Sequence, residues 1–119
     1  MTKVIFYRAD GIFYGFEEKG HTGFAESGND ILCAALSAMT MLIINTVEIS
    51  YATNVEYTID EETTDIRVMV HSILPENSGT DSEKRYAVSG LIEGYYYQLN
   101  DMLEDYYDYL DVEVSDDYK

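Results

Sequence analysis

Cysteine and basic residues are scarce in this chain of 119 residues, and each scarcity excludes a class of protein. The single cysteine, Cys33, cannot form a disulfide within the chain. Only 7 residues are Lys or Arg against 23 Asp or Glu, which gives a formal net charge of −16. Because affinity for nucleic acid depends on Lys and Arg side chains that neutralise phosphates, we expect no direct nucleic-acid partner. A charged partner should instead be basic.

The chain also lacks the N-terminal basic residues, apolar run and small-residue cleavage site of a secretory signal, and we therefore expect a cytoplasmic protein. Its longest uncharged run, Ile31 to Val47, reaches the lower limit of about 17 residues for a membrane span. Asp30 and Glu48 flank this run, where a membrane helix would carry basic anchors. We interpret the run as a buried core helix and expect no membrane partner.

The remaining composition favours a folded domain. Hydrophobic residues make up 46% of the chain, and they include twelve Tyr and four Phe. This is enough apolar material to form a packed core in spite of the charge. The length predicts one domain, residues 1–119.

Apolar residues that alternate with polar ones predict two β-hairpins. Residues 2–8 and 11–18 are rich in Val, Ile, Phe and Tyr, and they flank Asp10-Gly11, a pair favoured in tight hairpin turns. Residues 55–60 and 66–71 show the same alternation and should form the second hairpin.

Two helices should follow the hairpins. The first has Asn29 or Asp30 available as its N-cap and should run to about Ser50. The second follows Thr80-Asp81-Ser82-Glu83, which has the spacing of a capping box, and its apolar residues recur at intervals of three and four. Residues 112–114 could add a last strand. The order ββαββα predicts an α+β fold, with an antiparallel sheet of four or five strands and both helices on one face.

The second helix is rich in tyrosine and acidic residues, and Gly90 with Gly94 has the small-xxx-small spacing of close helix contacts. Packing explains both features. Tyr95, Tyr96 and Tyr97 are consecutive and cannot share one helix face, so a dimer interface or an aromatic peptide groove also remains open.

Residues capable of chemistry cluster where the first hairpin joins the first helix. If Asn29 or Asp30 is the cap, Cys33 lies in the first turn or at its edge, where unpaired N–H groups and the helix dipole favour a thiolate. His21 is the nearest histidine in sequence and can act as its base. Asp30 could orient this histidine or simply cap the helix. Ser37 could donate to the sulfur or bond back to the carbonyl of Cys33.

Other interpretations of these residues stand beside the catalytic one. A lone cysteine among alanines and leucines is commonly a small buried hydrophobe. Gly20, Gly23 and Gly28 either permit turns or form a flexible loop that folds over a bound peptide. One Cys and two His lack the ligand number and spacing of a zinc centre, so we expect no metal and no cofactor.

Six short features of this segment occur at fixed spacings. They are Gly20-His21, Phe24-Ala25, Gly28, Asp30-Ile31, Cys33-Ala34 and Ser37, four residues after the cysteine. This pattern resembles the signature of the ribosomal-processing cysteine proteases called Prp. Total length and element order are also similar to that family across nearly the whole chain.

The resemblance implies a cysteine endopeptidase in which Cys33 and His21 form the catalytic dyad. It implies cleavage of the N-terminal extension of a large-subunit ribosomal protein, the one numbered twenty-seven, after a paired aromatic. It further implies a homodimer and a glycine-rich loop that opens for substrate. The acidic composition independently suits a basic ribosomal protein precursor as substrate. The alternative is a non-catalytic acidic adaptor that binds a basic ribosomal protein and needs no cysteine.

Overall fold

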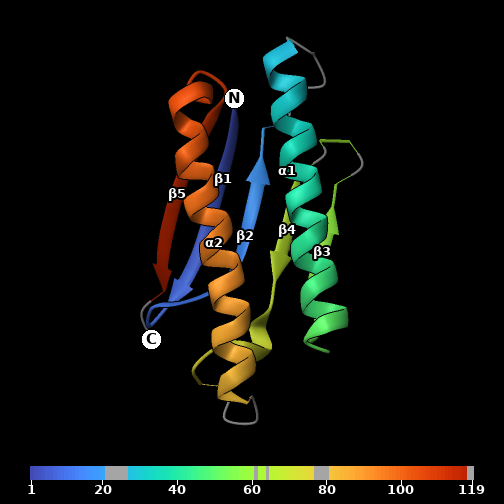
Figure 1. Ribbon diagram of the computed structural model, residues 1–119, viewed down its shortest axis with the longest axis vertical. Helices are drawn as coiled ribbons and strands as arrows, with labels where there is room; N and C mark the ends of the chain where they lie inside the picture. Colours follow the sequence, from blue (N-terminus) through green and yellow to red (C-terminus); the bar gives the residue numbers. More distant parts are fainter. Residues whose placement is uncertain (21–26, 61, 64, 77–80, 118–119) are drawn as a thin grey trace.

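The protein is a sheet of five strands with two long helices packed on one of its faces, as seen in a computed structural model (Figure 1). The structure describes residues 1–20, 27–60, 62–63, 65–76 and 81–117, without the side chains of residues 27–30 and 117. The strands are β1 (Thr2–Ala9), β2 (Ile12–Lys19), β3 (Glu56–Ile59), β4 (Ile66–Met69) and β5 (Leu110–Asp117). The helical segments are α1 (Ser27–Asn45), the π-helical turn η1 (Thr46–Ser50), the 3₁₀ turn η2 (His71–Ile73) and α2 (Ser82–Tyr106).

The sheet is mixed, which corrects the expectation of a purely antiparallel one. Its strand order is β3-β4-β2-β1-β5. The first four strands pair antiparallel, but β5 runs parallel to β1. The reason is that α2 carries the chain from β4 across the face of the sheet to the opposite edge, and such a helical crossover returns it in the same strand direction. Both helices do lie on one face, as expected (Figure 1).

Both predicted hairpins are present. In the first, Asp10 and Gly11 form the turn with φ of 51° and 79°, the positive values that a tight turn of this kind requires. Its register shifts between Tyr7 and Arg8, where β2 carries one extra residue. In the second, β3 pairs antiparallel with β4.

The helices differ from prediction mainly at their starts. α1 begins at Ser27, two residues before the first of the predicted caps, and η1 continues it to the predicted end at Ser50. α2 is capped by Asp81, whose carboxylate accepts a hydrogen bond from the Glu83 backbone N–H at 2.8 Å. The cap is therefore one residue later than the predicted capping box implies. α2 ends at Tyr106, so that Leu110 belongs to β5.

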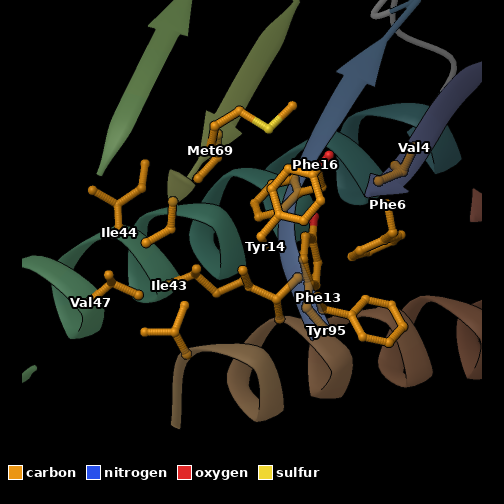
Figure 2. Packing of buried hydrophobic residues seen from close by; sticks show 14 of the residues in the cluster. Val4, Phe6, Phe13, Tyr14, Phe16, Ile43, Ile44, Val47, Met69 and Tyr95 are labelled. Atoms are coloured by element: carbon orange, nitrogen blue, oxygen red, sulfur yellow. The ribbon is translucent and has the colours of Figure 1, made fainter. Parts of the chain in front are cut away.

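An aromatic cluster fills the space between the sheet and the helices (Figure 2). Phe6 of β1 lies at its centre, with ring centroids 5.8 Å from Phe16 and 5.6 Å from Tyr95. Phe13 packs edge-on against Phe6 at 6.4 Å, and its backbone N–H donates to the Ser89 hydroxyl at 2.9 Å. This cluster joins α2 to β1 and β2.

Helix α1 buries one face and exposes the other. Its inward residues are buried, including Leu36, Ile43 and Ile44, and they pack on the sheet. Its outward face leaves Leu42 60% exposed, although the run had been expected to be buried. By length and composition alone, Ile31–Ser50 is the one stretch of the described chain that could cross a membrane, and a third of its most apolar window is buried.

Candidate active site

Cys33 lies on α1, further into the helix than the sequence predicts. It is the seventh helical residue, about 9 Å along the axis from Ser27. Only the first four N–H groups of a helix lack partners, and the dipole effect falls off within the first turn. The prediction that Cys33 lies in the first turn or at its edge, which assumed a cap at Asn29 or Asp30, is therefore wrong, and the argument for a helix-stabilised thiolate does not apply to this position.

The orientation of α1 sets the environment of the sulfur. Cys33 is partly buried, and Leu36 and Thr40, three and seven residues later, are buried on the same side of the helix. Ser37 is exposed one turn away. Cys33 thus lies at the edge between the sheet-facing and the solvent-facing sides of α1, neither fully buried nor fully open.

Other predicted site residues are described in part or not at all. His21 and Gly23 lie outside the described residues, and so does the side chain of Asp30, whose backbone belongs to α1. Gly28 belongs to α1, which places it outside the loop that was predicted to contain it. The position of His21 relative to Cys33 therefore stays a prediction.

Gly20 fixes the end of β2 just before the predicted catalytic segment. Its φ of +82° lies in the left-handed region that favours glycine. A Cβ at this position would lie 2.5 Å from the carbonyl oxygen of Met1. Its N–H also donates to Asp65 Oδ1 at 3.2 Å. Glycine is therefore required at position 20, and its backbone is held in place by a hydrogen bond. This supports a role in the local backbone conformation for Gly20, rather than one in a flexible loop.

A buried carboxyl near this end of β2 was missed in the sequence. Glu18 is fully buried, and Thr40 of α1 and Tyr95 of α2 donate hydrogen bonds to its Oε1 at 2.8 Å and 2.5 Å. Burial raises the pKa of Glu18 above its ordinary value, and the two hydrogen bonds oppose that rise. Alternation with the buried Phe16 could have indicated that Glu18 faces inward.

The second histidine is far along the chain from this cluster. His71 lies in η2, and its Nδ1 is 3.0 Å from Glu56 Oε2. It lines a cavity of about 340 Å³ together with Tyr14 and with Asp10, which belongs to the turn at the other end of the first hairpin from Gly20. Within the described ranges, no group of three or more His, Cys, Asp or Glu residues could hold a metal ion.

The family comparison identifies the kind of site. A model of the family described as "Cysteine protease Prp" matches residues 1–111, nearly the whole chain. The chain belongs to the Prp family of cysteine proteases. The match spans both His21 and Cys33, the residues that the signature assigns to the dyad. Comparison with curated proteins gives no match.

Solved structures similar to this Prp family member show the same fold. A protein from Streptococcus mutans is 24% identical, with a TM-score of 0.79, over 98% of this chain and 96% of that one. The essential ribosomal processing protease Prp from S. aureus, in complex with a substrate peptide, is 17% identical, with a TM-score of 0.72, over 100% of both chains. The same enzyme with a covalently linked product peptide gives 16% identity, a TM-score of 0.73, and 97% and 100% coverage.

Proposed function

We propose that this Prp family member is an endopeptidase in which Cys33 is the nucleophile and His21 the acid–base group. The observation that carries the proposal is the family match over residues 1–111, which includes both residues. Its support from the structure is the partly buried position of Cys33 on the side of α1 that borders the sheet. Cys33 is also the single cysteine of the chain, so no other thiol competes for the role.

The proposed substrate is the precursor of a basic large-subunit ribosomal protein, the one numbered twenty-seven, from which the enzyme removes an N-terminal extension. The complex of the S. aureus protease with a substrate peptide supports a peptide substrate for a chain of this fold. The net charge of −16 supports attraction of a basic partner. We further propose that the enzyme works in the cytoplasm as a homodimer.

The proposed mechanism proceeds through a thioester. His21 takes the proton of Cys33, and the sulfur attacks the scissile carbonyl carbon to form a tetrahedral adduct. The C–N bond then breaks as His21 returns the proton to the departing amine. Water attacks the thioester, which releases the acid product and restores the thiol. Because Cys33 lies beyond the first turn of α1, the imidazole is the group that must ionise the thiol.

Backbone N–H groups are the proposed stabilisers of the oxyanion. A helix that starts at Ser27 leaves the N–H groups of its first turn without helical acceptors, whereas the N–H of Cys33 is directed to the carbonyl of Asn29. The donors should therefore come from the start of α1, and not from the N–H of Cys33. Asp30 is proposed to orient His21.

The test is cleavage of a peptide that copies the extension and the first residues of the mature ribosomal protein. Mass spectrometry should find one cut with wild-type protein and none with Cys33→Ala or His21→Ala. Ser82→Ala is the control, because Ser82 is exposed at the start of the other helix, α2, and it should keep turnover within about threefold. Undiminished cleavage by Cys33→Ala would end the proposal.

The adaptor alternative predicts a different outcome from the same reagents. An acidic adaptor would bind the ribosomal precursor without cutting it, and Cys33→Ala would bind equally well. Selective alkylation of Cys33 well below the ordinary thiol pKa of about 8.5 favours the enzyme, while an inert sulfur favours the adaptor.

A further inference from the structure

Glu18 occupies an unusual place for a carboxyl group. It is the penultimate residue of β2, on the face that the helices cover, and none of its surface is exposed. Its neighbours in the two adjoining strands are Val4 on β1 and Ile66 on β4, both apolar. Because burial of a carboxyl is costly, a residue here needs compensating contacts.

Two hydroxyl groups from different helices provide these contacts. Thr40 Oγ1 of α1 donates to Glu18 Oε1 at 2.8 Å, and Tyr95 OH of α2 donates to the same oxygen at 2.5 Å. One side-chain oxygen therefore connects β2 to both helices. The hydrophobic effect itself is non-directional, whereas a hydrogen bond depends on distance and angle. The hydrogen bond to Glu18 therefore adds a directional constraint to the apolar packing of α1 on the sheet.

The residue of α1 that contacts Glu18 lies on the same side of the helix as Cys33. Thr40 follows Cys33 by seven residues, which places both on one side of the helix, two turns or about 10 Å apart. Glu18 is two residues before Gly20, which directly follows β2 and is held by a hydrogen bond to Asp65. A shift of Thr40 relative to β2 must therefore move Cys33 relative to that end of the strand.

We propose that Glu18 is a positioning residue. Through its hydrogen bond to Thr40, it holds α1, and with it Cys33, at the position along the helix axis and the rotation about that axis that the reaction needs. The inference rests on the proposed function, in which Cys33 is the nucleophile. Tyr95 makes an equivalent hydrogen bond from the helix that does not carry Cys33. The two hydroxyls thus form a matched pair, one expected to affect the reaction and the other expected to affect stability alone.

The experiment compares peptide cleavage by Thr40→Val, Thr40→Ser and Tyr95→Phe. Thr40→Val keeps the shape but loses the hydroxyl, and it should lower kcat about tenfold or more with little change in KM, since small misplacements of a reacting group are costly. Thr40→Ser restores the hydroxyl and should recover most of the rate. Tyr95→Phe should stay within about twofold of wild type in kcat while lowering the urea midpoint.

Alkylation of Cys33 by iodoacetamide provides a readout that does not depend on proteolysis. Because Cys33 is the only cysteine, the adduct reports on this site alone. Thr40→Val should change the alkylation rate about threefold or more across a pH series, and Tyr95→Phe should not.

The possible results separate the two proposals. If no peptide is cleaved by wild type, the proposed function fails, and the alkylation series still decides the role of Glu18. If folded Thr40→Val matches wild type in kcat and alkylation, the positioning role is wrong. Equal losses in Thr40→Val and Tyr95→Phe would also overturn it, because they would assign Glu18 a purely structural role.

Discussion

Gly15 and its partner Met69 show how closely the backbones of β2 and β4 approach each other. Gly15 pairs with Met69, and a Cβ on Gly15 would overlap Met69 Sδ and lie 2.6 Å from the Val68 carbonyl oxygen. Met69 is buried although alternation predicts that it faces solvent, because its side chain covers the glycine. Here the requirement for glycine comes from close approach of two strands.

Gly15→Ala should therefore destabilise the protein by about 1–3 kcal/mol, as overpacking does. Gly90→Ala is the control, because nothing lies within 4 Å of its Cβ position in the middle of α2. It should stabilise the protein by up to about 1 kcal/mol through higher helix propensity. Urea unfolding measures the stability of both variants. Equal midpoints would contradict the close approach of β2 and β4 at Gly15.

Glu18 should make stability depend on pH. Burial raises the pKa of this carboxyl in the folded state above its ordinary value of 4.5. The contribution of such a group is fully present below the unfolded pKa and is lost as pH rises through the folded pKa. The described groups that face it include Tyr95, Thr40, Val4 and Ile66, and burial also raises the pKa of Tyr95, so that its hydroxyl stays protonated.

Glu18→Gln removes this titration while it keeps the acceptor oxygen. As pH rises above about 4.5, wild type should lose unfolding free energy relative to the variant, by at most about 1.4 kcal/mol per pH unit, until the carboxyl is ionised in the folded state. Taking the difference between the two proteins cancels, to first order, the titration of the acidic groups they share. A difference that stays flat over this range would contradict a buried, titrating Glu18.

At the scale of elements, α2 is joined to the sheet by buried polar contacts as well as by the aromatic cluster, and Ser89 makes the one that serves a backbone group. Ser89 is 6% exposed, and its hydroxyl accepts the backbone N–H of Phe13 at 2.9 Å, one residue before the point where β2 carries its extra residue. This contact serves a backbone group beside an irregular part of the strand ladder.

Ser89→Ala should cost about 1–3 kcal/mol, because it leaves a buried N–H without its acceptor. Ser82→Ala, at the exposed start of the same helix, is the control and should change stability by less than about 0.5 kcal/mol. Chemical denaturation measures the loss of unfolding free energy in each variant. Should both substitutions prove equally mild, the contact to Phe13 would not hold α2 in place.

Much of the element order could be predicted from the sequence because it depends on local signals. The Asp10-Gly11 turn and the alternation around Val68 gave both hairpins, and the spacing of three and four around Ile92 gave α2. The parallel pairing of β5 could not be predicted in this way. It depends on which sheet edge α2 returns to, and no local pattern carries that information.

The candidate site was predictable in part, for similar reasons. The motif around Cys33 indicated the family, which the comparison confirms. The start of α1 was misplaced, because Asn29 and Asp30 are good cap residues and yet lie inside the helix. Glu18 was overlooked because a charged residue is ordinarily expected on the solvent side, and its inward position depends on hydroxyls from two distant segments.

For the whole molecule, the dominant feature is an excess of negative charge. The chain has 23 acidic residues against 7 basic ones, and the ion pairs in its described part include Arg8 with Asp116 and Lys3 with Glu113 on the β1–β5 pair. Self-repulsion at −16 opposes the compact state, whereas exposed ion pairs contribute little.

Salt should therefore stabilise the protein. Raising NaCl from about 0.01 M to about 0.5 M shortens the Debye length from about 30 Å to under about 5 Å and screens the repulsion. The thermal midpoint at pH 7 should rise, and equimolar KCl should have the same effect if screening is the cause. A lower midpoint at high salt would mean that attractive pairs dominate instead.

The central claim is that Cys33 becomes covalently acylated by the substrate. The most direct measurement is mass spectrometry of the enzyme after it is mixed with the extension peptide and quenched in acid. We predict a transient adduct with the mass of the N-terminal product less one water, located on the fragment that contains Cys33 and absent from Cys33→Ala. Cleavage by wild type without any such adduct, together with equal cleavage by Cys33→Ala, would contradict the account.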